Sequence, residues 1–220
     1  NNTSSFSELS SQWNYLGNNS SSFNTLSTQS NVLGDNESSY NAWSGQLNWS
    51  GDNLSVADAI ASQINTLGNN TAVDTGSAGQ STWIGDNEAT DVGFNQQWNT
   101  FGNNTAIDSD DDNDYDTTIQ SNWSGNNTAT NIENVGQHTV SGQNTATNGG
   151  DVGQNNYEGD NSAHGNDHAV QYNTSGTNVT TNNELAAQSN VEGHNIGVAN
   201  EHLAQGPVSY THLRAHETIA

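Results

Sequence analysis

Polar and apolar residues alternate along this chain in short runs, and the runs return at a fixed interval. A Gly-x-Asn motif recurs every 17 residues, with one interval of 23, and its glycines are Gly17, Gly34, Gly51, Gly68, Gly85, Gly102, Gly125, Gly142, Gly159, Gly176 and Gly193. We number the repeat from this glycine, so that each unit has positions 1 to 17. Threonine, valine, isoleucine and aromatic residues between clusters of Gly, Asn and Asp predict short β-strands joined by turns.

Two positions of the repeat carry the same amide residue in every unit. Twelve of the 14 glutamines in the chain fall on position 13, which chance does not produce. The asparagines of position 3 are Asn2, Asn19, Asn36, Asn53, Asn70, Asn87, Asn104, Asn127, Asn144, Asn161, Asn178 and Asn195. The glutamines of position 13 are Gln12, Gln29, Gln46, Gln63, Gln80, Gln97, Gln120, Gln137, Gln154, Gln171, Gln188 and Gln205. Such strict positions indicate that equivalent units stack on one another.

A unit of 17 residues is too short for a pair of helices and does not match the heptad of a coiled coil. We therefore expect an all-β fold, a β-solenoid of about twelve coils, each with two short strands and two turns. Side chains alternate along a strand, so positions 1, 3 and 5 share one side and positions 11, 13 and 15 share another. Because these positions vary least, we assign them to the interior, and positions 4, 6, 12, 14 and 16 to the outside.

An interior of asparagine and glutamine is explained by stacking. An unpaired buried amide costs about 1–3 kcal/mol. Coils about 4.8 Å apart allow each amide to bond the identical amide above and below, as in cross-β ladders. Only an uninterrupted row satisfies every member, so the sequence predicts internal ladders along positions 3 and 13.

The repeat divides the chain into two parts. Residues 1–206 form the expected solenoid domain, with an insertion around residues 109–114 that accounts for the single long interval. Residues 207–220 hold the only proline and the only arginine and do not follow the repeat. This tail resembles translated sequencing-adaptor read-through, and the other interpretation is a segment that caps the solenoid.

Two stretches, QSNVLGDNES from Gln29 to Ser38 and QHTVSGQNTA from Gln137 to Ala146, carry a family resemblance. They resemble curli-type amyloid subunits, whose repeats are rich in Gln-x-Gly-x-x-Asn-x-Ala and stack as two-strand coils into secreted fibres of the biofilm matrix. The present unit is shorter, has two extra residues between Gln and the next Asn, and has Asn where glycine follows Gln in places. The resemblance implies a functional amyloid: an extracellular or cell-surface fibre subunit that associates end to end.

The charge balance narrows the possible partners. The chain has 1 Lys or Arg against 24 Asp and Glu, a net charge of −23. Such a chain cannot neutralise nucleic-acid phosphates or dock on an anionic membrane. The sequence also has no cysteine and no apolar run as long as a membrane span. No nucleophile–base constellation or phosphate-binding loop stands out, so we expect a structural or surface-binding protein and no enzyme.

One candidate metal site lies in the insertion. Asp108, Asp110, Asp112, Asp114 and Asp116 alternate along the chain, so an extended loop could bring several carboxylates to one Ca²⁺ ion. The pattern is not an EF-hand, because Asn113 and Ile119 replace its glycine and its bidentate glutamate. The simpler interpretation is a solvated acidic loop.

Aromatic residues form a candidate surface stripe. Position 16 holds Tyr15, Trp49, Trp83, Trp123 and Tyr157, and position 14 holds Trp13, Trp98 and Tyr172, on the same outward side of one strand. This stripe could bind a surface polysaccharide or pack rods laterally. It could also be ordinary strand surface, because aromatic residues favour strands.

Two further functions remain in competition with the fibre. A solenoid of this length also suits the stalk of a surface adhesin. Threonine pairs at positions 4 and 6, Thr128 with Thr130 and Thr145 with Thr147, suggest an ice-binding row, but Glu88 and His164 interrupt it elsewhere.

Overall fold

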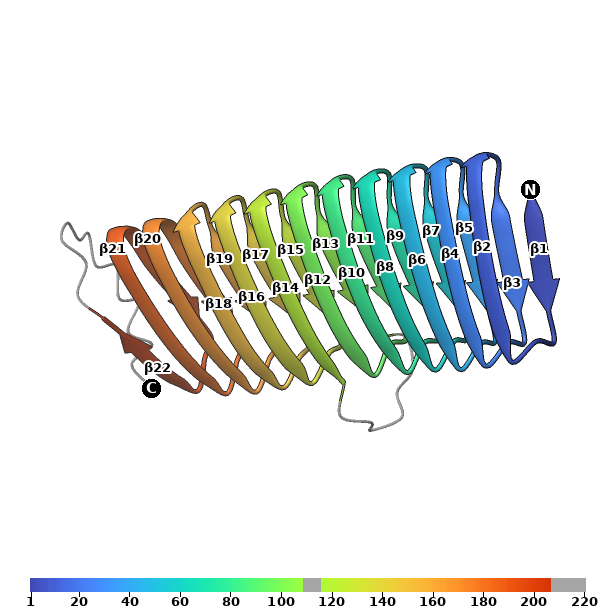
Figure 1. Ribbon diagram of the computed structural model, residues 1–220. Helices are drawn as coiled ribbons and strands as arrows, with labels where there is room; N and C mark the ends of the chain where they lie inside the picture. Colours follow the sequence, from blue (N-terminus) through green and yellow to red (C-terminus); the bar gives the residue numbers. More distant parts are fainter. Residues whose placement is uncertain (109–115, 207–220) are drawn as a thin grey trace.

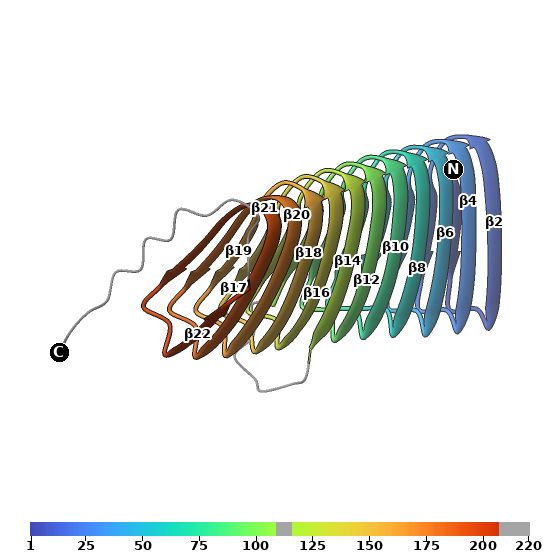
Figure 2. The same ribbon diagram turned by 90° about the vertical axis from the view of Figure 1, so that its left-hand side faces the viewer.

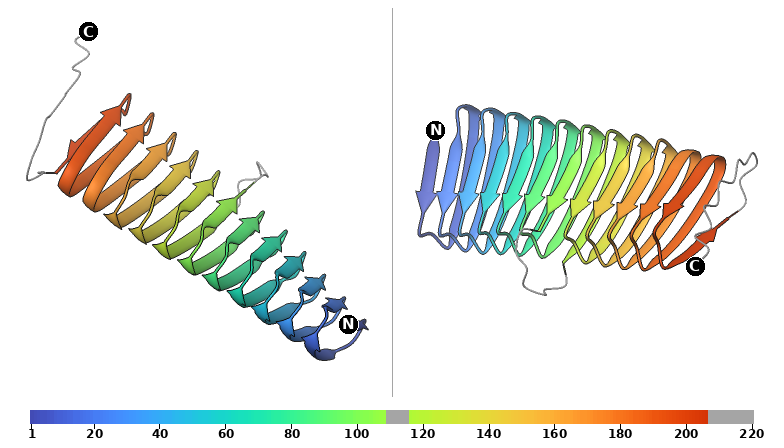
Figure 3. Two further views of the ribbon diagram at one scale, coloured as in Figure 1. Left: turned by 90° about the horizontal axis from the view of Figure 1, so that it is seen from above. Right: turned by 180° about the vertical axis from the view of Figure 1, so that it is seen from behind.

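The computed structural model describes residues 1–108 and 116–206. Within these ranges the chain is an all-β parallel solenoid of about twelve coils, stacked in sequence order along one axis (Figure 1). The long strands of successive coils lie side by side in one layer, and the short strands lie in a second layer (Figures 2 and 3). The predicted fold class is therefore confirmed. The proposed nature of residues 207–220 concerns a segment outside the described residues.

Each coil consists of one short strand, a turn and one long strand. The short strands have four residues each: β1 (Asn2–Ser5), β3 (Asn19–Ser22), β5 (Asn36–Ser39), β7 (Asn53–Val56), β9 (Asn70–Val73), β11 (Asn87–Thr90), β13 (Asn104–Ile107), β15 (Asn127–Thr130), β17 (Asn144–Thr147) and β19 (Asn161–His164). The long strands have eight residues each: β2 (Leu9–Leu16), β4 (Leu26–Leu33), β6 (Trp43–Ser50), β8 (Ile60–Leu67), β10 (Ser77–Ile84), β12 (Phe94–Phe101), β14 (Thr117–Ser124), β16 (Asn134–Ser141) and β18 (Asp151–Glu158). Near the C-terminal end, β20 (His168–Thr181) and β21 (Leu185–Val198) each join a long strand to the next short one, and β22 (His202–Gln205) follows.

Every strand pairs in parallel with the equivalent strand of the next coil. The register places Gln80 beside Gln97 and Asn87 beside Asn104. The insertion does not disturb this register, because Gln97 still pairs with Gln120 across it. Residues one repeat apart in the sequence are thus the residues that pair in the sheet.

The predicted amide ladders fill the interior. Asn36 Nδ2 donates to Asn53 Oδ1 of the next coil at 3.0 Å, and it also reaches Asn48 Oδ1 across the interior at 2.7 Å. Gln63 Nε2 donates to Gln46 Oε1 of the preceding coil at 2.9 Å. The same bonds recur along the rod, and these side chains are buried from Asn19 to Asn178 and from Gln29 to Gln188. The asparagine ladder thus donates toward the C-terminal end and the glutamine ladder toward the N-terminal end, so their dipoles oppose each other.

Small residues allow the two strand layers to approach. Alanine or serine at position 5 faces alanine, serine or another small residue at position 11, as in Ala72 and Ala78. The apolar part of the interior is correspondingly thin and consists largely of small side chains. It has two clusters, one of Ala72, Ala78, Ala89 and Val92, and one of Ala106, Ala129, Ile132, Val135, Ala146 and Val152. Hydrogen-bonded amides, more than apolar burial, therefore occupy the space between the layers.

The two turns of each coil are made in different ways. At position 1, glycines with positive φ, such as Gly102 at 143°, turn the long strand into the next short strand. At position 7, residues with side chains take positive φ, among them Asn131 at 56° and Asp74 at 49°. The side chain that follows stabilises this second turn: Asn24 Oδ1 accepts a hydrogen bond from the backbone N–H of Ser7 at 2.8 Å.

Two turns in each coil were predicted from the sequence. The positive φ at position 7 and the buried side chains of position 8, such as Asn24 and Asp58, were not. The glycines of position 1, which were assigned to the interior, lie half-buried in the first turn.

Within residues 1–108 and 116–206, no helix is long and apolar enough to cross a membrane.

Candidate functional site

The outward-facing residues of the long strands form one broad surface, which we call the long-strand face. It comprises positions 10, 12, 14, 16 and 17 of each repeat. The first seven long strands, β2, β4, β6, β8, β10, β12 and β14, contain no Asp, Glu, Lys, Arg or His. All six tryptophans of the chain lie exposed on this face, between 50% and 65% accessible: Trp13, Trp43, Trp49, Trp83, Trp98 and Trp123. A wide, neutral and aromatic surface therefore covers one side of a strongly acidic rod.

The acidic side chains of the same coils lie in the turns and on the short strands. Asp35, Asp52 and Asp86 stand at position 2, where each carboxylate accepts the backbone N–H of position 2 in the next coil, as in Asp52 N to Asp35 Oδ1 at 3.0 Å. Asp58 is buried at position 8 and accepts bonds from Ser38 Oγ, Ser55 Oγ and the backbone N–H of Asn41. Charge is thus segregated from the long-strand face by the turns.

The aromatic stripe at position 16 alternates between large and small residues. Its five rings, Tyr15, Trp49, Trp83, Trp123 and Tyr157, are 54–62% exposed. The residues between them at the same position are half-buried: Val32, Thr66, Thr100, Val140 and Thr174. Every second coil therefore carries a projecting ring, and the coil between carries a short β-branched side chain.

Aromatic residues in adjacent coils behave differently. At position 7, Phe6, Phe23 and Tyr40 stack face to face, with centroids 5.0 and 5.1 Å apart and ring planes within 2° and 4° of parallel. Among the described residues, no other aromatic pair stacks in this way. The rings of the position 16 stripe lie two coils apart and cannot stack on one another, so their faces are free to contact a ligand.

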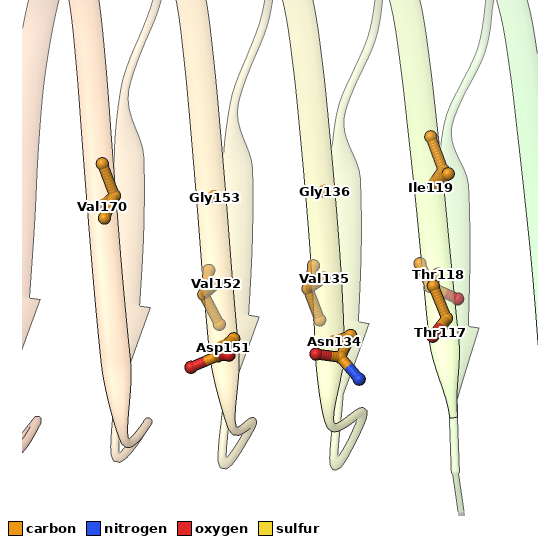
Figure 4. Close-up of a pocket in the computed structure, with 10 residues that line it drawn as sticks. All are labelled: Thr117, Thr118, Ile119, Asn134, Val135, Gly136, Asp151, Val152, Gly153 and Val170. Atoms are coloured by element: carbon orange, nitrogen blue, oxygen red, sulfur yellow. The ribbon is translucent and has the colours of Figure 1, made fainter. Parts of the chain in front are cut away.

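Shallow hollows interrupt the long-strand face at position 12, where small residues alternate with larger neighbours. One hollow of about 420 Å³ is lined by Trp13, Thr28, Gly45, Leu47, Ser62 and Ile64, among others. A second, of about 380 Å³, lies where Gly136 and Gly153 separate Ile119 from Val170 (Figure 4). The hollows run across several coils, so an occupant would lie along the rod axis.

The sequence analysis missed part of this face. Position 10 adds Leu9, Trp43 and Phe94, and position 17 adds Leu67 and Phe101, all exposed. Position 10 could have been found from the alternation of side chains along the strand. Position 17 breaks that alternation, since positions 16 and 17 are both exposed at the end of the long strand, so no pattern in the sequence pointed to it.

The face becomes polar toward the C-terminal end. His168 Nδ1 lies 2.6 Å from Asp151 Oδ1 in the neighbouring coil, and both side chains are exposed. The hydrogen bond to Asp151 raises the pKa of His168 above its ordinary value of 6.5. Desolvation opposes this increase, and the charges of Asp151, Glu184 and Asp167 add smaller contributions that raise the pKa further. This pair is a surface interaction between coils.

The predicted calcium site is only partly within the described residues. Asp110, Asp112 and Asp114 lie outside them. Asp116 is buried just before β14, and its carbonyl oxygen accepts the N–H of Asn134. Among the described residues, no three His, Asp or Glu side chains are grouped to hold a metal ion. The calcium site remains a prediction.

The candidate ice-binding threonines lie on the outer face of the short strands. Thr128 lies beside Thr145, and Thr130 beside Thr147. Exposed Glu88 stands in the row of Thr128, and exposed His164 in the row of Thr147. Threonine pairs at positions 4 and 6 together thus occur in only two adjacent coils, because Ile107 stands beside Thr130 in the preceding coil and His164 beside Thr147 in the following one.

No known protein family, no curated protein and no solved structure matches this chain. The geometry of the coils and of the long-strand face is therefore what bears on its function.

Proposed function

We propose that this protein is a structural, non-catalytic subunit of an extracellular or cell-surface fibre, which assembles when the solenoids of successive chains stack end to end. The proposal rests on one observation: the first coil offers the hydrogen-bonding groups that the last described coil needs in order to continue its ladders. Each coil meets the next through the same register, the same amide ladders and the same parallel pairing. The resemblance of the repeat to curli-type fibre subunits agrees with it.

The first and last described coils carry matching hydrogen-bonding groups. From Asn19 to Asn178, each ladder asparagine donates from Nδ2 to the next coil, and from Gln29 to Gln205 each ladder glutamine donates from Nε2 to the preceding coil. In the last described coil, Asn195 Nδ2 is buried and has no hydrogen-bond partner among the described residues. Asn2 Oδ1 in the first coil is the acceptor that such a donor needs, and Gln12 Nε2 is the donor for Gln205 Oε1. Stacking one chain on another would therefore continue both ladders.

This contact is head to tail and not closed by rotation, since every coil translates along the rod axis. Heterologous contacts of this kind generate open filaments. Whether a given coil belongs to the same chain or to the next one, the interface is the same.

The test is electron microscopy of the full chain after concentration, together with X-ray diffraction of aligned material. We expect unbranched filaments and a meridional reflection near 4.8 Å. A seeded preparation should elongate without a lag.

A double variant, Thr3→Pro with Ser5→Pro, targets the interface. Asn2 N and Phe6 N donate to the second coil, so by alternation the N–H groups of Thr3 and Ser5 face the open edge. Proline there removes the edge donors and blocks an incoming strand, while the bonds to the second coil remain. The matched control, Thr3→Ala with Ser5→Ala, keeps these donors and should still form filaments.

Two results would contradict the proposal. One is a wild-type chain that stays as single rods of roughly 55 Å, the length of about twelve coils, at every concentration. The other is a proline variant that forms filaments as readily as the wild type. Single rods would favour the adhesin stalk.

A further inference from the structure

We propose that the long-strand face binds a neutral polysaccharide laid along the rod axis, with the aromatic residues of position 16 stacking on every second sugar. This inference is independent of filament assembly, because a single rod already presents the complete face. It assigns a ligand class to Tyr15, Trp49, Trp83, Trp123 and Tyr157.

Charge selects a neutral ligand. The chain carries a net charge of −23, yet its first seven long strands hold no ionisable side chain apart from tyrosine. A polyanion would be repelled by the protein as a whole, and a polycation would prefer the acidic turns. A surface without charged side chains therefore favours an uncharged ligand.

Spacing selects an extended, repeating ligand. Rings at position 16 occur in every second coil, which places them about 9.6 Å apart at the usual strand separation of about 4.8 Å. One sugar of an extended β-1,4-linked chain has nearly the length of one coil step, and one disaccharide nearly that of two. A glycan chain parallel to the rod axis would therefore meet a ring at about every second sugar.

The rings are also free to stack on a ligand. The C–H bonds on the face of a sugar ring carry partial positive charge, and an aromatic face carries partial negative charge. At position 7, the adjacent rings of Phe6, Phe23 and Tyr40 cover one another's faces. At position 16, half-buried Thr66 and Thr100 stand beside exposed Trp83 and leave room on both sides of its ring.

The long-strand face also has shallow hollows at position 12, lined by both polar and apolar side chains. The hollow around Gly45 is lined by the hydroxyl-bearing residues Ser11, Thr28 and Ser62, together with Trp13 and Ile64. Sugars combine hydroxyl groups at their edges with apolar faces, so they match such a mixture. A second copy of this chain could cover the apolar residues by simple contact, but that would not require rings in alternate coils.

The experiment uses hydroxyethyl cellulose, a soluble neutral β-1,4-glucan, as the probe in affinity gel electrophoresis and tryptophan-fluorescence titration of the full chain. Carboxymethyl cellulose, which has the same backbone with negative charges, is the matched ligand control. We expect retardation and a fluorescence change with the neutral glucan, and binding at least tenfold weaker to the charged one.

Two variants and a control test the role of the stripe. The triple variant Trp49→Thr, Trp83→Thr and Trp123→Thr introduces the residue that already occupies position 16 in other coils, so the fold should tolerate it. We expect a loss of affinity on the order of a hundredfold. The exchange variant Thr66→Trp with Trp83→Thr keeps the aromatic content and changes only the spacing, and it should also bind more weakly. Thr66→Ala with Thr100→Ala, the control, should bind like the wild type.

Three results would overturn the proposal. The first is a wild-type protein that neither is retarded nor changes its fluorescence with the neutral glucan. The second is an exchange variant that binds as tightly as the wild type, since the spacing would then have no role. The third is a wild-type dimer in sedimentation that the triple variant abolishes in the absence of glycan, because the face would then be an interface between copies.

Discussion

At the scale of single residues, each ladder amide satisfies several partners at once. Gln97 Nε2 donates to Gln80 Oε1 at 2.8 Å and to the carbonyl oxygen of Thr105 at 2.9 Å. Its Oε1 accepts from Gln120 Nε2 at 2.9 Å. An amide has both donors and an acceptor at the correct reach, and no apolar or charged side chain supplies that combination. The strictness of position 13 follows from this requirement.

Position 15 shows which substitution an interior row can accept. Thr82 replaces asparagine there, and its Oγ1 accepts from Asn70 Nδ2 at 2.9 Å and donates to Asn87 Oδ1 at 2.8 Å. Thr139 does the same between Asn127 and Asn144. A hydroxyl group both donates and accepts, so it can stand in where only one bond of each kind is needed.

Two adjacent glutamines allow a direct test of the ladder. Gln97→Leu should lower the free energy of unfolding by roughly 2–5 kcal/mol, because it leaves the buried Gln80 Oε1 and the Thr105 carbonyl without donors. Gln96→Leu changes the same residue type on the exposed face and should alter stability by less than about 0.5 kcal/mol. Urea denaturation followed by circular dichroism measures both. Equal effects of the two substitutions would contradict the ladder as a source of stability.

The pair of His168 and Asp151 gives a pH-dependent prediction. The pKa of His168 is raised in the folded state, so its contribution to stability is complete below the ordinary pKa of 6.5 and is lost as the pH rises through the raised value. Because the pair is exposed, solvent screens it and the contribution to stability is small.

Asp151→Asn should lower the pKa of His168 toward its ordinary value, since it removes the largest cause of the increase. An NMR titration of the histidine ring protons measures this. Glu184→Gln, which removes a more distant charge, should have a smaller effect. A His168 pKa that is unchanged in Asp151→Asn would show that the bond is not formed in solution.

At the scale of strands and turns, the glycine of position 1 permits the close stacking of coils. Gly102 has φ of 143°, and a Cβ atom built on it would overlap the carbonyl oxygen of Gly85 in the preceding coil. Any other residue would be strained by the backbone angle and would also push two coils apart. Position 1 is therefore glycine for two reasons that act together.

Substituting glycines at two positions separates these effects. Gly102→Ala should destabilise the fold by more than about 2 kcal/mol, from strained φ and overlap with the backbone. Gly136→Ala, on the outer face, meets no atom within 4 Å and should change stability by about 0.5 kcal/mol in either direction. Urea midpoints compare them. A neutral Gly102→Ala would mean that the coils can separate at this turn without cost.

At the scale of the whole molecule, the fold is one-dimensional. Each coil contacts its neighbours, and the stability of such a protein is close to a sum over coils and interfaces. The insertion between β13 and β14 illustrates this, because the registers before and after it are the same. The ladders therefore continue in the same register across the insertion.

The same geometry gives filament growth a salt dependence. Two chains joined end to end each carry a charge of −23, and the repulsion opposes the contact. Raising the salt from about 0.01 M to about 0.15 M shortens the screening length from roughly 30 Å to roughly 8 Å. Elongation from seeds, measured by light scattering, should therefore be faster at the higher salt concentration. Slower growth would indicate that attraction between charges drives assembly.

The sequence by itself determined the solenoid, the length of its coils, the two amide ladders and the inward direction of positions 3, 5, 11, 13 and 15. It could do so because a buried amide needs an identical neighbour, and that requirement leaves an unbroken row in the sequence. The aromatic stripe was also visible, since side chains alternate along a strand.

Only the tertiary structure decided how these rows act together. It gave the opposite directions of the two ladders, because donor and acceptor of an amide look alike in a sequence. It revealed the turn at position 7, where residues as different as Phe6, Asp74 and Asn131 share a positive φ that bonds to the adjacent coil stabilise. It also showed that positions 10, 12, 14, 16 and 17 of the first seven long strands form one neutral face. The order of residues along a chain does not reveal that the turns hold the acidic side chains away from this surface.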